Sequence, residues 1–518
     1  MKKIYLTLCL ITVLTFCSLN AEDKTIKIFF TGNTNGHPLA FTDMNESGQG
    51  GIPARATLVK EEGGSRYKNN VLLLDAGGVF GGRPESNMFN GMPDIVGMNT
   101  MKYDCAAIGI PELQRTAKDF ELLNQKCEFT YIGANVSIMN KITKRTELLS
   151  DDYFIKKVGG LKVGIFSVIT EDAKYLIRPS YQSEYIISDP IKAANSAASK
   201  LKREKNCDIV IALTYLGYYP EDPQAMDTEA LANNIKNVDI IIDGRTSIDN
   251  EDPDIINDIP IFQVGKWGLS VGEINLIIKN NKVAEWTYKI HPVNRKVNGE
   301  YVGDKTYEDD FVTLAAIKGA MATYDAVAGA RLCKVDPDFD FDITAVRFAE
   351  CDFGNLLCDA VLEYTGADAV LMNTGGIDPK AKVDPNKITR KSFDNVITFD
   401  NPVVVIAMTG KEIRDSLQYS INRKGYGSFL QIAGITCDYN SRGQVFNVCK
   451  NGLPLEDHLH YRVAVSSWML LGGDGYGSLK KCPVKTEASM LIREILYNYV
   501  EEKEIITVPK GGRINAVD

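Results

Sequence analysis

The stretch LLLDAGGVFGGRP, Leu72 to Pro84, joins an apolar run that ends in one acid to a segment with four glycines and an arginine. A continuous apolar run of this length is typical of a strand buried on both faces, and the glycines after it indicate a turn. Runs of the same kind recur along the first half of the chain, in IKIFFTG, KVGIFSVI, CDIVIALTYLG and VDIIIDGRTS. The repeated pattern predicts a layered α/β domain.

A second domain is predicted to follow the first. The stretch SVGEINLIIKNNKVAEWTYKIHPV indicates two alternating strands around an Asn280–Asn281 turn, which closes the first domain, residues 25–300. The apolar spacing in DDFVTLAAIKGAMATYDAV predicts a bridging helix over 308–325, and a new pattern of strands and helices fills 326–518. A chain of 518 residues is too long for one ordinary core, which also favours two domains.

The charge of the chain argues against one class of partner. The net charge is −9, and no basic run is present that could neutralise a phosphate backbone, so a nucleic-acid polymer is not expected as a partner. The mean hydropathy of −0.13 leaves no room for several membrane spans. We therefore expect a soluble globular chain without a transmembrane span after processing.

The first residues have the pattern of an export signal. Residues 1–21, MKKIYLTLCLITVLTFCSLNA, carry two lysines, an apolar stretch and a small residue before charged EDK, which predicts a cleaved secretory signal. A membrane anchor is the alternative, although the apolar stretch is shorter than the ~20 residues of a span. A lipid on Cys17 is a further alternative. The mature chain is expected in the periplasm or cell envelope.

Cysteine usage excludes two kinds of site. No Cys-x-x-Cys pair occurs among the 11 cysteines, so neither a zinc ribbon nor a thioredoxin-like centre is expected. Export permits disulfides, and two pairings suggest themselves: Cys105 with Cys127, and Cys437 with Cys449.

Several motifs resemble those of a known family. RFAECDFGNLLCDAVLEYTGADAVLMNTGGID, GSFLQIAGITCDYN and YRVAVSSWMLLGGDGYG together resemble the substrate-binding domain of the secreted 5′-nucleotidase family. GGIPARATLVKEE, LLLDAGG and MNTMKYDCAAIG resemble its calcineurin-like metallophosphatase domain. The resemblance implies an α/β sandwich of metallophosphatase type, a bridging helix and a 5′-nucleotidase-type C-terminal α/β domain, with nucleotide catabolism as the family's role.

The resemblance also implies a two-metal centre, whose expected ligands this chain lacks. Two divalent ions activate water and stabilise the charge on phosphate, and they need carboxylates and imidazoles as ligands. Other residue types stand at the matching positions: Asn33, Asn35, Gly78, Ile110, Pro111, Tyr215, Arg245 and Ser247. Only four histidines occur, and of these only His37 lies in a candidate loop of the first domain. We therefore predict a degenerate metal site, no catalytic residues and no cofactor.

An alternative keeps a divalent metal. Asp75, Glu112 and Asp243 lie near the same strand ends, and three carboxylates could hold a weak Ca²⁺ or Mg²⁺. In the resembling family the positions of Asp75 and Glu112 support the site rather than ligate the ions. Arg245 is expected to face the former pocket and to pair with Asp75 or Asp243.

The second domain keeps more of the family's binding residues. Phe429 and Tyr476 match the two rings that stack a nucleobase, and Arg347 and Asn373 match its polar contacts. Base stacking is worth ~1–3 kcal/mol per base. Asp378 stands where the family places a cation, so the affinity for phosphate is expected to fall.

Three functions remain open. The first is an exported, catalytically inactive member of the resembling family that binds a nucleoside or nucleotide-like small molecule, or a protein partner. The second is an active metal-dependent phosphohydrolase with a rebuilt site. The third is a scaffold or surface protein in which neither pocket works. A phosphate-release assay separates the second function from the others, and titration with nucleosides separates the first from the third.

Overall fold

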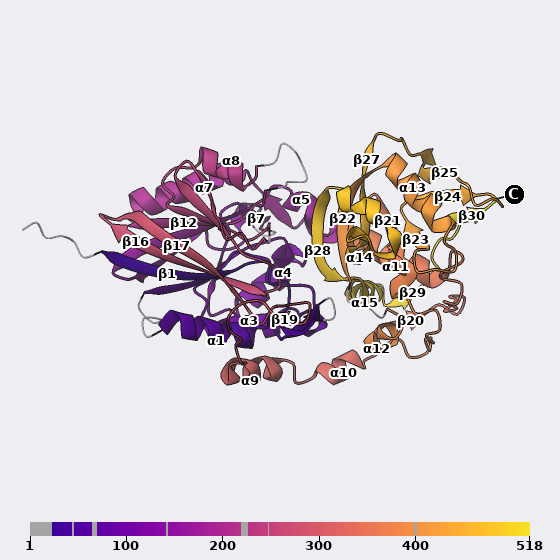
Figure 1. Ribbon diagram of the computed structural model, residues 1–518, viewed down its shortest axis with the longest axis horizontal. Helices are drawn as coiled ribbons and strands as arrows, with labels where there is room; N and C mark the ends of the chain where they lie inside the picture. The colour runs from indigo at the N-terminus through magenta and orange to yellow at the C-terminus, as the bar shows by residue number, and fades with distance from the viewer. Residues whose placement is uncertain are drawn as a thin grey trace, which may run out of the picture.

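The computed structural model describes residues 23–43, 46–64, 70–140, 143–218, 226–246, 248–397 and 401–517. The predicted signal segment with Cys17, and Ser247, lie outside these ranges. Figure 1 shows two α/β domains, which confirms the predicted fold class. In place of one bridging helix the structure has two short ones, α9 (Phe311–Ala320) and α10 (Tyr324–Ala328), which run along the lower edge of the view.

The N-terminal domain consists of two six-stranded sheets packed face to face. The first has the order β17 (Lys282–Pro292), β16 (Ser270–Lys279), β1 (Lys24–Thr31), β4 (Val71–Asp75), β5 (Cys105–Ala107), β6 (Thr130–Ile132). The second has the order β14 (Asp254–Ile256), β15 (Ile259–Gln263), β13 (Ile240–Asp243), β12 (Ile209–Tyr215), β10 (Leu161–Ile169), β9 (Tyr153–Val158). The predicted hairpin is confirmed as β16 and β17, paired antiparallel.

The central strands of each sheet are parallel, as their continuous apolar runs predict. Side chains alternate between two cores: Ile28 and Phe30 of β1 face the space between the sheets, while Phe29 faces the helices outside. The first sheet is covered by α1 (Ile52–Gly63), α3 (Met92–Met101), α4 (Ala117–Asn124) and α9, and the second by α7 (Pro190–Ser199) and α8 (Thr228–Asn234). Parallel strands place their carboxyl ends, and the loops that follow them, along one edge.

The C-terminal domain has its own sheet and core. Its five strands have the order β23 (Leu430–Ala433), β21 (Ala369–Asn373), β27 (His460–Ser466), β22 (Pro402–Thr409), β28 (Val484–Leu491). Helices α11 (Asp352–Thr365) and α15 (Ile492–Lys503) pack on one face, and α13 (Gly410–Ile421) packs on the other. A second sheet has the order β26 (Leu453–Pro454), β25 (Val445–Lys450), β24 (Thr436–Tyr439), β30 (Ile514–Ala516).

The remaining elements are short. The strands are β2 (Phe41–Asp43), β3 (Glu46–Gln49), β7 (Val136–Met139), β8 (Thr146–Leu148), β11 (Tyr185–Ile187), β18 (Lys296–Val297), β19 (Glu300–Tyr301), β20 (Lys334–Val335) and β29 (Ile505–Ile506). The helices and helical turns are α2 (Pro84–Asn87), η2 (Pro111–Leu113), α5 (Ala173–Leu176), α6 (Pro179–Gln182), η3 (Lys200–Glu204), η4 (Thr374–Gly376), α12 (Arg390–Asp394), α14 (Ser467–Leu470), η5 (Gly473–Gly475) and η6 (Gly477–Lys481). Within the described ranges, no helix combines the length and apolar character that a membrane crossing requires.

Both suggested disulfides are wrong. The nine cysteines of the described ranges are free thiols. Cys105 lies in the core between the two sheets, whereas Cys127 packs on the outer side of the first sheet. Cys449 is paired in register with Thr436, so the neighbouring Cys437 points to the opposite face.

Candidate functional site

The strand ends of the N-terminal domain bring most of the predicted replacement positions together. They lie in the loops after β1, β4, β5 and β13 and at the end of β12: Asn33, Asn35, Gly78, Ile110, Pro111, Arg245 and Tyr215. The residues of this set that line one cavity are Asn33, Asn35, Ile110, Pro111, Tyr215 and Arg245. The topology of the predicted sheets therefore places these positions as the resemblance implied.

Hydrogen bonds join these loops directly. The backbone N–H groups of Asn33 and Asn35 donate to the carbonyls of Gly77 and Gly78, each at 2.8 Å. The hydroxyl of Tyr215 donates to Oδ1 of Asn33 at 2.5 Å. Burial raises the pKa of Tyr215 well above its usual value, so the phenol stays protonated as a donor. The loops after β1 and β4 are thus held to each other and to β12 by uncharged groups.

Gly78 leaves no space for a larger ligand residue. Its φ is +79°, a conformation that side chains other than glycine rarely adopt. A Cβ at this position would lie 2.3 Å from Oδ1 of Asn33 and 3.2 Å from the Tyr215 ring. The contact between Asn33 and Tyr215 therefore occupies the space into which a side chain at position 78 would extend.

The three nearby carboxylates support loops. Glu112 accepts hydrogen bonds from the backbone N–H groups of Gly78, Val79 and Gly109 at 2.7–3.0 Å, and it is fully buried. Burial raises its pKa above the usual value, although these bonds oppose the shift.

Asp75 and Asp243 are equally enclosed. Asp75 accepts from the Thr31 hydroxyl at 2.6 Å and from the Gly77 N–H at 2.9 Å, and burial raises its pKa to about 7. Asp243 accepts from the N–H groups of Leu216 and Gly217 at 3.1 Å. Neither acid, nor Glu112, is among the described residues that line the cavity. The three carboxylates therefore hold the loops whose N–H groups donate to them.

Arg245 faces the cavity, but its expected partners are wrong. Its Nη1 donates to the carbonyl of Leu216 at 2.8 Å and lies 3.8 Å from the carboxylate of Asp172. Among the described residues, the carboxylate near its guanidinium is that of Asp172, because backbone groups and hydroxyls already surround Asp75 and Asp243. The guanidinium adds positive charge to the cavity wall.

His37 lies close to the strand-end loops but turns away from the cavity. Its ring stacks on Trp267 with centroids 5.4 Å apart and contacts Phe41 at 4.3 Å. Burial and the charge of Arg83 lower its pKa to about 3, so the imidazole is neutral. It packs as an aromatic ring in a buried cluster.

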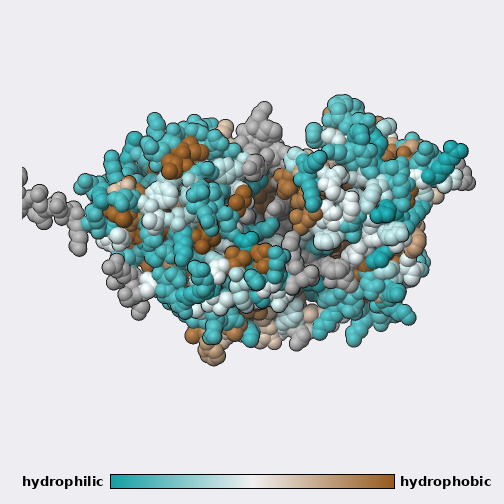
Figure 2. Space-filling model, viewed as in Figure 1, coloured by the Kyte–Doolittle hydropathy of each residue, from teal (hydrophilic) through white to brown (hydrophobic). Residues whose placement is uncertain are grey.

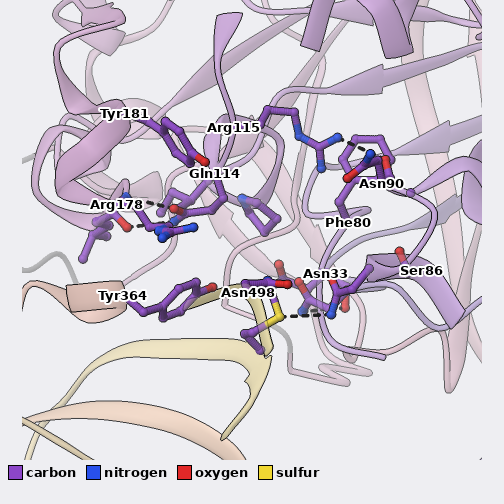
Figure 3. Close-up of a pocket in the computed structure, with 18 of the residues that line it drawn as sticks. Asn33, Phe80, Ser86, Asn90, Gln114, Arg115, Arg178, Tyr181, Tyr364 and Asn498 are labelled. Carbon is purple, nitrogen blue, oxygen red and sulfur yellow. Dashed lines mark hydrogen bonds between the residues drawn. The ribbon is translucent and has the colours of Figure 1, made fainter. Parts of the chain in front are cut away.

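The cavity lies between the two domains and has a volume of about 1060 Å³. One wall comes from the C-terminal domain, from Met490 of β28 and from Tyr364 of α11 and Asn498 of α15, the last two labelled in Figure 3. The surface is also hollowed where the domains meet (Figure 2). Arg178 and Glu502 form a two-pronged ion pair across the boundary, at 2.9 and 3.1 Å.

The predicted base clamp of the C-terminal domain is not formed by the expected rings. Phe429 is fully buried and Tyr476 is 2% exposed, with its hydroxyl donating to the carbonyl of Ser428 at 2.5 Å. Both rings pack in cores, so neither offers a free face to a base. The prediction of a stack between them is therefore wrong for this conformation. Arg347 is partly exposed and donates to the carbonyl of Ile377.

Asp474 and Trp468, next to the buried Asn373, form a partly exposed polar and aromatic surface that the sequence analysis missed. Asn373 donates to Asp474 at 2.6 Å and accepts from the Ser466 hydroxyl at 2.7 Å. Trp468 is 50% exposed and lies against Gly473, the neighbour of Asp474. We call Asn373, Asp474 and Trp468 the C-terminal face. Its one signal in the sequence is a large ring, Trp468, just before the turn LLGGDGYG.

The C-terminal face and the strand-end loops are not brought together. The described residues that line the interdomain cavity include neither Arg347 nor Asn373, and neither Phe429 nor Tyr476. The C-terminal domain instead presents β28 and α15 to the cavity.

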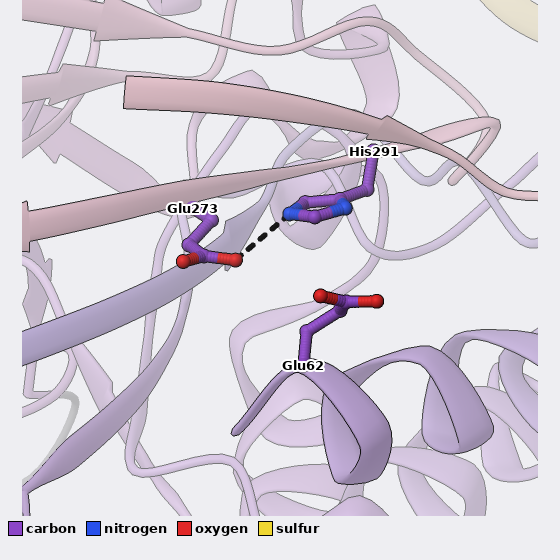
Figure 4. Close-up of side chains that lie close together, drawn as sticks. All are labelled: Glu62, Glu273 and His291. Atoms are coloured by element: carbon purple, nitrogen blue, oxygen red, sulfur yellow. Dashed lines mark hydrogen bonds and ion pairs between the residues drawn. The ribbon is translucent and has the colours of Figure 1, made fainter. Parts of the chain in front are cut away.

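A further group of possible metal ligands lies beside the β16–β17 hairpin (Figure 4). Glu62, Glu273 and His291 each place one ligand atom within 4.8 Å of the others. Nε2 of His291 lies 2.8 Å from Glu273, and Lys27 donates to the other Glu273 oxygen at 2.6 Å. Burial raises the pKa of Glu273, but the bonds from His291, Lys27 and Asn275 outweigh burial and lower it to about 2. A lysine already neutralises this carboxylate, so the group forms a buried ionic network.

Comparisons with known proteins cover both domains. Residues 326–481 match the family model described as 5′-nucleotidase, C-terminal domain. The chain is 27% identical over 523 residues to a 5′-nucleotidase of Vibrio cholerae, covering 94% of this chain and 92% of the relative. It is 28% identical over 558 residues to protein UshA of Escherichia coli, covering 97% and 98%.

Two solved structures are similar in fold. Haemophilus influenzae NAD nucleotidase has a TM-score of 0.78 at 17% identity, with 96% of this chain and 100% of that chain covered. The 5′-nucleotidase precursor from Thermus thermophilus has a TM-score of 0.53 at 24% identity, with 95% and 99% covered.

These relatives overturn the expectation that no cofactor is needed. 5′-nucleotidases of the metallophosphatase family normally use divalent metals, so the alternative stated above, a divalent metal, is the one that the comparisons support. The described residues at the strand ends do not fit a two-metal centre, because the cavity wall there offers amides, a phenol and a guanidinium, and the carboxylates are turned into the loops.

Proposed function

Because the chain is similar to 5′-nucleotidases over most of its length, we propose that it is an exported protein that binds a nucleoside or nucleotide-like small molecule through its C-terminal domain. The observation that carries the proposal is the C-terminal face, where the half-exposed ring of Trp468 lies beside the hydrogen-bonded pair Asn373 and Asp474. A flat ring stacks on an exposed aromatic side chain, and a carboxylate accepts hydrogen bonds from hydroxyl groups. These two groups suit a base joined to a sugar.

The charge near this face favours an uncharged ligand. Asp378 is partly exposed, and its carboxylate accepts a local hydrogen bond from the N–H of Lys380 at 2.9 Å. Two like charges at ~4 Å repel by about 1 kcal/mol in water and about 4 kcal/mol at an effective dielectric of 20. A nucleoside is therefore expected to bind this face more tightly than its monophosphate.

Export rests on residues 1–21, whose pattern of lysines, apolar stretch and small residue supports a cleaved signal. Such a signal would deliver the mature chain to the periplasm or cell envelope. Retention through a lipid on Cys17 is part of the same proposal as an alternative to a free protein. Mass measurement of the mature chain from its native host distinguishes the two forms.

Metal-dependent hydrolysis of nucleotides is the second candidate function. The relatives favour it, because proteins named 5′-nucleotidase match this chain over most of its length. A rebuilt site would have to use Asp75, Glu112 and Asp243. Each of these carboxylates is at most 1% exposed and accepts backbone hydrogen bonds. We rank binding before hydrolysis because the side chains at the strand ends that face the cavity are poor metal ligands.

Two measurements test the proposal. Calorimetric titration with adenosine is expected to show binding to the purified chain, and Trp468→Ala is expected to weaken it by about tenfold, since stacking is worth ~1–3 kcal/mol. Phe446→Ala, which removes another partly exposed ring of the same domain, is the matched control. Equal affinity of the wild type and Trp468→Ala contradicts the binding site. Release of phosphate from AMP with Mg²⁺, Mn²⁺, Co²⁺ or Zn²⁺ favours the second function.

A further inference from the structure

The interdomain cavity is positively charged although the chain is acidic. Five cationic and three acidic side chains line it in the described ranges: Arg115, Lys126, Arg178, Arg245 and Arg462, against Asp119, Glu501 and Glu502. The whole chain carries a net charge of −9. A cleft with an excess of one charge and low-dielectric walls concentrates ions of the opposite sign. Anions are therefore attracted to this cavity and repelled by most of the remaining surface.

Arg115 differs from Arg178 and Arg245, two other arginines of the cavity. Arg178 has a carboxylate partner in Glu502, and Arg245 lies 3.8 Å from Asp172. In the described part of the chain, Arg115 has no carboxylate oxygen within 4 Å, and its Nη1 donates to a backbone carbonyl, that of Asn90, at 3.2 Å. Its Nε is buried without a hydrogen-bond partner.

The environment of Arg115 fixes its position. The guanidinium stacks on the ring of Phe80 at 4.3 Å, with the hydrogen bond to Asn90 at its side (Figure 3). Burial lowers the pKa of Arg115, and the charges of Glu112 and other groups oppose this shift only from a distance. Glu112 itself is held by three backbone N–H groups. Arg115 is half-buried, and a partly desolvated cation without an ionic partner gains from an anion bound in the cavity.

We propose that Arg115 is the anion-binding residue of the interdomain cavity, and that it takes the phosphate or carboxylate group of a small ligand. The planar guanidinium can donate two parallel hydrogen bonds to such a group. Leu122 and Tyr181 line the same cavity, and their apolar groups suit an aromatic body on the ligand. This site is separate from the C-terminal face, so the proposal does not depend on nucleoside binding there.

The test uses the full mature chain and three probes without added metal: phenyl phosphate, benzoate and inorganic phosphate. Calorimetry is expected to show binding of at least one probe to the wild type and at least tenfold weaker binding to Arg115→Gln. Lys126→Gln removes a charge from an exposed position on the wall of the same cavity and is the matched control, with less than threefold change expected. Comparison of phenyl phosphate with benzoate assigns the group as phosphate or carboxylate.

Three results overturn the inference: no binding of any probe to the wild type, equal affinity of the wild type and Arg115→Gln, or equal losses in Arg115→Gln and Lys126→Gln. Thermal unfolding of each variant checks that it folds. If Arg115→Gln does not fold, Arg115→Lys answers the question, because lysine keeps the charge but loses the paired hydrogen bonds. At least threefold weaker binding supports the proposal, and unchanged affinity contradicts it. Loss of adenosine binding in Trp468→Ala with intact probe binding identifies the C-terminal face as a separate site.

Discussion

The hydroxyl of Tyr215 donates a hydrogen bond to Oδ1 of Asn33, 2.5 Å away, and so connects the end of β12 in one sheet to the loop after β1 in the other. Both residues are largely buried, at 5% and 9% exposure. The two sheets are thus joined at their strand ends by an amide and a phenol.

Removal of this hydroxyl is expected to destabilise the fold. Tyr215→Phe leaves the buried Asn33 oxygen without its donor, which should lower the free energy of unfolding by about 1–3 kcal/mol. Tyr218→Phe is the control, because the Tyr218 hydroxyl bonds to Asp254 at an exposed site. Denaturant unfolding measures the free energy of unfolding of both variants. Equal decreases would show that the hydrogen bond between the sheets stabilises the fold no more than an exposed one does.

A methyl group at position 78 is expected to lower the free energy of unfolding by more than the strain of its backbone conformation alone. Gly78 and Gly48 have similar φ values, +79° and +75°, but a Cβ at Gly48 meets no atom within 4 Å, whereas one at Gly78 lies 2.3 Å from Asn33. Gly48→Ala should cost about 1–2 kcal/mol through strain. Gly78→Ala should cost clearly more. Equal costs would mean that the loop has room for a side chain.

The stability of the fold is expected to depend on pH through Asp75. Burial raises its pKa from 3.8 to about 7, so the folded chain holds a proton that the unfolded chain releases. The contribution of this group is complete below pH 3.8 and is lost as the pH rises to about 7; a shift of roughly 3 units corresponds to at most about 4 kcal/mol. Asp75→Asn removes this loss. Relative to the wild type, it should be more stable at pH 8 than at pH 4 by denaturant unfolding, and the same difference at both pH values would contradict the assignment.

Phe429 is expected to act on stability rather than on binding. Its ring is fully buried, so Phe429→Ala should lower the free energy of unfolding by about 3–5 kcal/mol. Phe429→Leu, which keeps most of the volume, should recover most of this loss and bind adenosine as the wild type does. If Phe429→Leu is stable but binds adenosine more weakly, the ring of Phe429 takes part in binding after all.

The fold was predictable from the sequence because continuous apolar runs specify buried parallel strands, and their order specifies which loops meet. The positions of Asn33, Gly78 and Tyr215 followed from that order. The roles of the aromatic rings in the C-terminal domain could not be predicted in this way. An aromatic residue beside an apolar strand can pack in the core as readily as it can face a ligand. Phe429 directly precedes β23 and packs inward, whereas Trp468, in a short helix after β27, is half exposed.

Arg115 carried no signal in the sequence. It belongs to no motif, and its importance depends on two features that only the fold creates: the cavity between the domains and a guanidinium with no carboxylate oxygen of the described residues within 4 Å. The cysteine pairings failed for a related reason, because the sequence alone did not show on which side of a sheet each thiol packs.

The most direct test of the binding proposal is a crystal structure of the full mature chain with adenosine. The account predicts density for the base against the Trp468 ring, with the sugar within hydrogen-bond distance of Asp474. Adenosine bound only in the interdomain cavity, or a C-terminal face left empty at saturating adenosine, would contradict it.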